Sequence, residues 1–226
     1  MLPESQIKAS TKEVVTDIKD VVLEPDEILI SYDVVSLYTN VPVEQAINET
    51  ADLLYDGRWD DPPIDKNTFI ELTRLCSTNV LMATTDGYYR QKEGLGMGLP
   101  SAPGLANVWM SKYDTIITQD KPKLYKRYVD DILTTILRNK IDEKLKQINE
   151  LHDNLTFTYE TEDSSGKLSF LDALLQHKEH KVSSTWYTKP TDNGLILNFH
   201  SLAPSKYKRN IVQGFVHRVY NACSDW

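Results

Sequence analysis

The chain has 226 residues, of which 40% are hydrophobic and 26% are charged, and its formal net charge is −8. This length and composition are those of a globular protein that buries a core of its own, and they exclude a low-complexity or fibrous chain. No apolar run approaches the roughly 20 residues that cross a bilayer, and the opening MLPESQIKAS lacks the apolar stretch of a secretory signal. Cys76 and Cys223 lie far apart, without metal-ligand spacing. We therefore expect an intracellular protein that is not secreted and has no membrane contact.

Helices and hairpins alternate along the sequence. Helical spacing of apolar residues is found at 7–24, 43–55, 65–80, 103–118, 140–152 and after Pro204. Single strands are expected at 28–35, 155–160, 167–177 and 181–188, and hairpins at 80–91, with Asp86-Gly87 as the turn, and at 123–137. This alternation predicts an α+β fold with an antiparallel sheet and packed helices.

The negative charge is unevenly distributed. From residue 181 to 218 there is a single acidic residue, Asp192, against six basic residues: Lys181, Lys189, Lys206, Lys208, Arg209 and Arg218. A basic segment is the electrostatic footprint of a nucleic-acid contact. The acidity lies in the first three quarters of the chain, where solvated surface carboxylates and a divalent-cation site are both open explanations.

Two carboxylate positions stand out from the apolar pattern. Asp33 is the one charged residue in the buried-type strand ILISYDVVSL, where a carboxylate pairs, caps a turn or binds metal. Asp130 and Asp131 lie between two apolar strands, and because neighbouring strand side chains point to opposite faces, we expect both aspartates in a tight turn from which they reach one pocket. Each position alone is open to a structural explanation. Together they supply the hard oxygen ligands that Mg²⁺ takes in two-metal nucleotidyl transfer.

The Gly-rich segment EGLGMGLPSAPG precedes the helix expected at 103–118. Gly94, Gly96 and Gly98 form G-x-G-x-G, which is superficially similar to a dinucleotide-binding loop. That fingerprint requires a further glycine where this chain has Leu99, and no βαβ unit surrounds the segment. A nucleotide cofactor is therefore not expected.

In this order, SYDVVSLYTNVP, GLGMGLPSAPGLANVWM and YVDD resemble motifs A, B and C of reverse transcriptases, and more narrowly those of Penelope-like retroelements. LSFLDALLQ at 168–176 and the closing run WYTKPTDNGLILNFHSLAPSKYKRNIV are similar to that family's segments leading from the palm into the thumb. The resemblance covers the chain from about residue 28 to its end. It implies a polymerase palm-type fold with incomplete fingers and thumb: a fingers or connector remnant at 1–27, a palm at 28–180 and a palm-to-thumb segment at 181–226.

The resemblance also implies catalytic roles for individual residues. Asp33, Asp130 and Asp131 would be the catalytic, metal-binding carboxylates, with the Val34 carbonyl assisting. The cofactor would be Mg²⁺, with Mn²⁺ as an alternative. Tyr38, as a steric gate beneath the incoming sugar, would favour dNTPs over rNTPs, although a packed core aromatic is the alternative role for this tyrosine.

Further roles follow for the substrate pocket and for nucleic-acid contacts. Met97 and Gly98 would let the backbone approach the template base and the nascent pair, as glycine permits. Leu99 departs from the family, which has a small residue there. The basic residues expected to contact nucleic acid are Lys126, Arg127, Lys206, Lys208 and Arg209, and solvated positions are the alternative for each.

The activity implied is that of an RNA-directed DNA polymerase, in the nucleus or cytoplasm, that adds dNTPs to the 3′-hydroxyl of a DNA primer on an RNA template. The first alternative is an inactive or co-opted retroelement remnant that acts only as a nucleic-acid or protein binding module. The second is an RNA-templated RNA polymerase, against which Tyr38 argues. The third is an α+β domain with chance motifs. The oligomeric state stays open.

Overall fold

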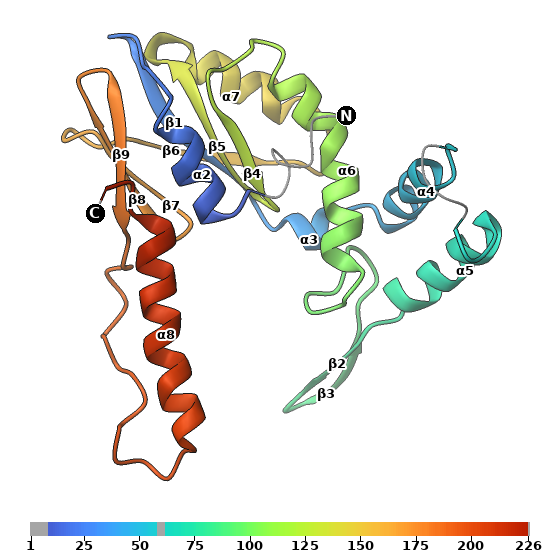
Figure 1. Cartoon of the computed structure of the whole chain (residues 1–226). Helices are drawn as coiled ribbons and strands as arrows, with labels where there is room; N and C mark the ends of the chain where they lie inside the picture. The colour runs from blue at the N-terminus through green and yellow to red at the C-terminus, as the bar shows by residue number, and fades with distance from the viewer. Residues whose placement is uncertain (1–8, 58–61, 226) are drawn as a thin grey trace. The chain divides into compact units, whose positions relative to one another are not determined.

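The computed structural model describes residues 9–57 and 62–225 (Figure 1). In chain order it contains α2 (Thr11–Ile18), β1 (Glu27–Val34), α3 (Leu37–Asn40), α4 (Val43–Leu54), α5 (Lys66–Ser77), β2 (Leu81–Thr84), β3 (Gly87–Arg90), α6 (Ala102–Ile117), β4 (Tyr125–Tyr128), β5 (Asp131–Leu137), η1 (Arg138–Lys140), α7 (Ile141–Asn149), β6 (Phe157–Thr161), β7 (Lys167–Phe170), β8 (Ala173–Lys178), β9 (Lys181–Trp186) and α8 (Ser205–Ala222). The chain forms two compact units. Of the described residues, unit 1 holds Asp33–Lys121 and Glu143–Thr158, and unit 2 holds the rest.

Three sheets are present in the described residues. Four strands form one sheet in the order β4-β5-β1-β6, and β4 and β5 are an antiparallel hairpin. β7, β8 and β9 form an antiparallel meander, and β2 and β3 a separate hairpin. The predicted α+β class, with antiparallel sheets and packed helices, is confirmed.

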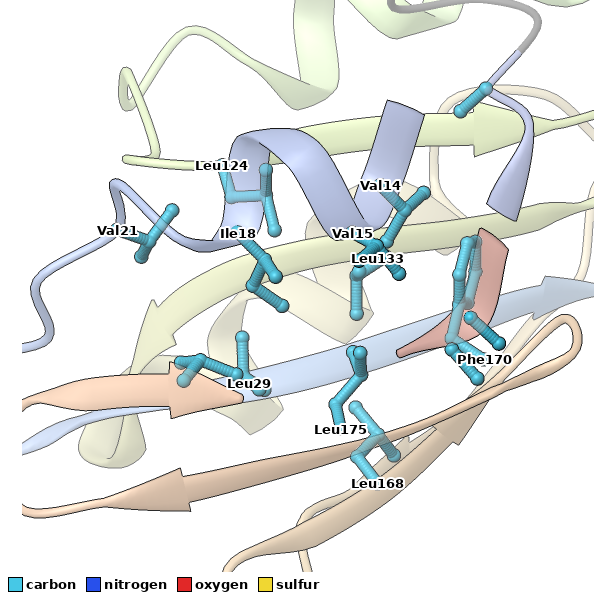
Figure 2. Close-up of a cluster of buried hydrophobic side chains, with 14 of the residues drawn as sticks. Val14, Val15, Ile18, Val21, Leu29, Leu124, Leu133, Leu168, Phe170 and Leu175 are labelled. Carbon is cyan, nitrogen blue, oxygen red and sulfur yellow. The ribbon is translucent and has the colours of Figure 1, made fainter. Parts of the chain in front are cut away.

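The core of unit 2 lies among α2, the β1-β5 sheet and the β7-β8-β9 meander (Figure 2). The buried residues labelled there are Val14, Val15, Ile18, Val21, Leu29, Leu124, Leu133, Leu168, Phe170 and Leu175. The 3.6-residue period of α2 places Val14, Val15 and Ile18 on one face. This face packs in one cluster with buried residues of both sheets.

The helix α2 is shorter than the apolar period at 7–24 predicts, and residues 7 and 8 of that prediction lie outside the described part of the chain. It begins with a capping box, in which the Ser10 hydroxyl accepts from the Glu13 amide and the Glu13 carboxylate accepts from the Ser10 amide. It ends at Ile18 instead of near residue 24. The chain continues in extended form, and the Leu23 amide donates to the His180 carbonyl at 3.0 Å. Long-range pairing therefore replaces the last helical turn, while Leu23 stays buried.

Unit 1 is built on helices. α4 contacts both α5 and α6, and buries Ala46, Ile47 and Ala51. Two ion pairs join exposed edges of these helices: Arg74 of α5 with Glu44, and Lys112 of α6 with Glu49. The helices predicted at 43–55, 65–80 and 103–118 are confirmed, with ends that differ by up to three residues.

The hairpin predicted at 80–91 is present, but its predicted turn is wrong by one residue. Gly87 pairs with Thr84, so the turn residues are Thr85 and Asp86. The hydroxyls of Thr84 and Tyr89 donate to the Asp86 carboxylate at 2.7 and 3.0 Å and hold its pKa below the usual range. The Asp86 side chain thus closes the turn one residue earlier.

The single strand predicted at 167–177 is also wrong. The segment is two strands, β7 and β8, and Phe170 pairs directly with Ala173. Leu171 has a left-handed φ of 52°, which a two-residue turn requires and a strand pattern does not reveal.

Candidate functional site

The β4-β5 hairpin carries two of the three predicted catalytic carboxylates. Tyr128 pairs with Asp131, so the two turn residues are Val129 and Asp130. The expectation that both aspartates occupy the turn is therefore wrong: Asp131 is the first residue of β5. Both aspartates are half-buried, which leaves part of each side chain accessible to solvent.

The backbone of this turn is strained. Val129 has φ +58°, in the left-handed region that a β-branched residue rarely adopts. Arg127 Nη1 donates to the Val129 carbonyl at 2.9 Å. Residues held in such conformations cost on the order of 1–3 kcal/mol and are found preferentially at functional sites. The strained residue lies directly beside the Asp130-Asp131 pair.

Val129→Gly is expected to raise the free energy of unfolding by about 0.5–1 kcal/mol, because glycine adopts positive φ without the Cβ clash. The measurement is urea unfolding of the variant beside the unchanged chain. Val35→Gly, at an exposed position outside the left-handed region, is the matched control and is expected to destabilise. Equal destabilisation by both substitutions would show that the turn is not strained.

Lys126 and Arg127, predicted to contact nucleic acid with solvated positions as the alternative, are both buried. Their residues are 4% and 0% exposed. Lys126 Nζ lies 2.5 Å from a carboxylate oxygen of Asp17 in α2, and the Arg127 carbonyl accepts from the Ala9 amide. Because α2 and Ala9 lie over this strand, both cations make contacts inside the protein.

Asp33 lies next to the last residue of β1. The burial of β1 alternates at this end, so Asp33 is exposed between the buried Tyr32 and Val34. Sequence reasoning placed this carboxylate in a buried strand, whereas the structure turns it to solvent. Burial raises the pKa of the Tyr32 hydroxyl beside it, and nearby Tyr159 adds to the effect, so this tyrosine is neutral at physiological pH.

Tyr38 lies in α3, a single turn that follows directly on β1. Ser36 enters the turn with φ +51°, and the Tyr38 side chain is half-buried. The Tyr38 carbonyl accepts from the Leu95 amide at 2.7 Å. This bond joins the segment that follows β1 to the Gly-rich loop within unit 1.

The Gly-rich loop exposes the residues predicted to approach the base pair. Met97 is 74% exposed, and Gly98 is exposed with φ +91°. Leu95 and Gly96, by contrast, are buried, so the loop is anchored at its start and open at its centre.

A preformed metal centre is not evident in the described residues. Across 9–57 and 62–225, no three His, Cys, Asp or Glu side chains are grouped so as to hold a metal ion. Asp33 belongs to unit 1, whereas Asp130 and Asp131 belong to unit 2. All three offer carboxylate oxygens, the donor type that Mg²⁺ and Mn²⁺ prefer, and all three are at least partly accessible.

The basic residues of α8 differ in what they contact. Lys206 and Arg209 are exposed on its first turns. Lys208 is half-buried, donates to the carbonyls of Phe199 and Ser201 at 2.5 and 2.7 Å, and lies 5.4 Å from the Phe199 ring centre. Lys208 therefore fastens the preceding segment to the helix, a role that sequence reasoning did not foresee.

Each unit has a groove among its described residues. That of unit 2, about 720 Å³, is lined by Leu197, Ala203, Pro204, Tyr207, Asn210, Ile211, Gly214, Phe215 and Arg218. That of unit 1, about 670 Å³, lies beside the segment that follows Tyr38 and includes Thr39, Asn40, Glu44, Arg90, Lys92, Gly94 and Asn154. Among the described helices, every one is too short or too polar to cross a bilayer.

Comparison with known proteins identifies the fold but no family. No family model matches the chain, and no curated protein matches it. Among solved structures, telomerase from Candida albicans in complex with a fragment of telomeric RNA is 12% identical, with a TM-score of 0.57 over 77% of this chain and 35% of that one. Telomerase from Candida tropicalis in complex with a telomeric RNA fragment is 15% identical, with a TM-score of 0.57 over 92% and 37%. The apo telomerase of the same organism, truncated from its C-terminal domain, is 19% identical, with a TM-score of 0.53 over 76% and 40%.

These identities are low, so the similarity is one of fold. Telomerases are related to reverse transcriptases, and the chain accordingly has a reverse transcriptase-like fold, similar to a fragment of a telomerase polymerase domain. It spans between 35% and 40% of the length of these telomerases. The narrower resemblance to Penelope-like retroelements stays a prediction.

Proposed function

We propose that this chain is part of an RNA-directed DNA polymerase of the Penelope-like type, which adds dNTPs to a DNA primer on an RNA template. The observation that carries the proposal is the strained β4-β5 turn, which presents Asp130 and Asp131 on a reverse transcriptase-like fold. The order of motifs along the sequence supports the same activity. β1, the strand with Asp33 near its end, is next to β5 in the sheet order.

In this proposal Asp33 and Asp130 are the main ligands of Mg²⁺, with Asp131 and the Val34 carbonyl assisting, and Mn²⁺ is the alternative ion. When bound, the ions supply electrostatic stabilisation of the attacking and leaving oxygens. The carboxylates themselves have two tasks. They place negative charge at a strand end and in a turn, and their partial exposure leaves oxygens accessible to a ligand.

Substrate selection would fall to unit 1. Tyr38 would lie beneath the sugar of the incoming nucleotide and exclude a 2′-hydroxyl, while Met97 and Gly98 face the nascent pair. The half-buried Tyr38 ring on a single helical turn and the exposed centre of the Gly-rich loop support these roles.

Nucleic-acid contact would involve α8. Lys206 and Arg209 are exposed on turns without an acidic residue, an arrangement suited to phosphate contact. The telomerases of similar fold were solved with telomeric RNA, which supports an RNA partner here.

The test is primer extension on an RNA template with Mg²⁺ or Mn²⁺, using the chain, its Asp130→Asn variant and an Asp142→Asn control. Asp142 is exposed on α7 and lies outside the proposed site. All three proteins must first melt cooperatively. We expect Asp130→Asn to lower the extension rate by about a thousandfold or more, since removing one ligand of a two-metal site costs several kcal/mol, and the control to be unchanged.

Equal extension by Asp130→Asn and the unchanged chain would contradict the assignment of Asp130. Silence from all three folded proteins would contradict the polymerase proposal. That result would favour the second candidate, a binding module, for which the exposed cations of α8 would then be the first residues to replace.

A further inference from the structure

Gly94 lies against the backbone of the segment that carries the proposed sugar gate. Its φ is +73°, in the left-handed region. A Cβ added to Gly94 would meet the Thr39 carbonyl oxygen at 2.4 Å, the Thr39 Cα at 2.5 Å and the Thr39 carbonyl carbon at 2.6 Å. All three atoms are backbone, so no side-chain rotation relieves the contact. Both residues belong to unit 1.

The hydrogen bond beside this contact involves Tyr38 directly. The Leu95 amide donates to the Tyr38 carbonyl at 2.7 Å, and Leu95 is fully buried. The close approach at Gly94 and the hydrogen bond from Leu95 therefore hold two successive residues, Tyr38 and Thr39.

Hydrogen bonds hold both segments in contact, the Gly-rich loop and the turn that contains Tyr38. On the loop side, the Gln91 amide donates to the Val80 carbonyl at 2.9 Å, and the Gln91 side-chain amide donates to the Glu93 carbonyl at 2.9 Å. On the gate side, the Thr39 hydroxyl donates to the Ser36 carbonyl at 2.9 Å. A side chain at position 94 therefore forces these two backbone segments apart and displaces the turn that contains Tyr38 relative to the Gly-rich loop.

We propose that Gly94 is a positioning residue: it fixes how far the Tyr38 ring extends toward the sugar of the incoming nucleotide, and thereby the choice between dNTPs and rNTPs. This inference rests on the proposed function, because it assigns to Gly94 a share of the sugar discrimination of that site. A gate that excludes one hydroxyl group acts through steric contact, so a displacement of a fraction of an ångström is enough to admit it. Gly94 acts through Tyr38 and touches no reacting atom.

The experiment compares Gly94→Ala with Gly104→Ala, both first shown to melt cooperatively. Gly104 lies in α6 with open space where a Cβ would be added, and it lacks a left-handed φ. The first measurement is kcat/KM for a dNTP and for the matching rNTP in primer extension. Gly94→Ala is expected to lower the dNTP-to-rNTP ratio by about tenfold or more, chiefly through KM, while Gly104→Ala leaves the ratio within about twofold.

The second measurement, amide hydrogen exchange, does not require activity. In Gly94→Ala the Leu95 amide is expected to exchange at least about tenfold faster, with no change in Gly104→Ala. In the unchanged chain, Leu95 and Val41, whose amide donates to the Leu37 carbonyl, are expected to exchange together as one opening unit. This comparison tests whether the Gly-rich loop and the Tyr38 turn open together, even where Gly94→Ala does not fold.

The outcomes separate the two proposals. An inactive parent chain would contradict the proposed polymerase, while the exchange result would still decide whether Gly94 holds the Tyr38 turn. Unchanged exchange at Leu95 in Gly94→Ala, independent opening of Leu95 and Val41, or an unchanged nucleotide ratio in an active variant would overturn the role of Gly94.

Discussion

Leu133→Ala is expected to lower the free energy of unfolding by about 3 kcal/mol, a large part of the stability of an ordinary domain. Leu133 is fully buried in β5, in the cluster where α2 packs over the sheet and the β7-β8-β9 meander (Figure 2). Truncation removes the transfer free energy of its methyl groups and leaves a cavity that β5, hydrogen-bonded within the sheet, cannot close. The measurement is urea unfolding of the variant and of the unchanged chain. The two free energies are compared with the same slope of free energy against urea concentration.

The control for this prediction is Leu81→Ala in the β2-β3 hairpin. Leu81 is 66% exposed, so its truncation is expected to cost less than about 0.5 kcal/mol. If both truncations cost the same, the cluster in Figure 2 is not the core on which unit 2 depends.

Arg127→Ala is expected to cost about 3 kcal/mol. The Arg127 side chain is fully buried, so its removal leaves the space of its long stem and leaves the Val129 carbonyl without the Nη1 donor. Arg138→Ala is the matched control, because the Arg138 side chain is 64% exposed and its ion pair with Glu162 spans 3.7 Å, a contact that contributes less than about 1 kcal/mol.

A double variant shows how much of this cost is due to the strained turn. In a Val129→Gly background the turn needs less support, so Arg127→Ala is expected to cost about 1 kcal/mol less than it does alone. Strict additivity of the two substitutions would mean that Arg127 stabilises the core without holding the turn.

The spacing of apolar residues predicted the helices well where one face of the helix is buried and the other is exposed. α4, α5 and α6 follow their apolar period to within three residues, because each packs one face against a neighbouring helix. The predictions were wrong where a segment distant in the sequence covers the element and so determines which of its side chains are buried. β4 reads as a strand with exposed cations, but α2 covers it, and Lys126 pairs with Asp17 more than a hundred residues earlier in the sequence.

The sequence predicts which residues form the candidate site but not their conformation. The motifs single out Asp33, Asp130 and Asp131, whose roles stay a prediction, without indicating that Asp33 is exposed or that Val129 adopts a left-handed backbone. The sequence shows Gly94 only as the first glycine of the G-x-G-x-G pattern, because its contact with Thr39 links segments that no local pattern connects. A glycine in such a pattern, without a nucleotide-binding context, is the signal that points to a close backbone approach.

The packing of α2 has a consequence for synthesis of the chain on the ribosome. α2 packs against β9 and α8, which follow it in the sequence by more than 160 residues and are therefore translated after it. The apolar face of α2 accordingly stays without these partners in the nascent polypeptide until α8 has been translated. Such exposed surface is where chaperones bind and where premature association begins, so unit 2 can complete its packing only after α8 has emerged.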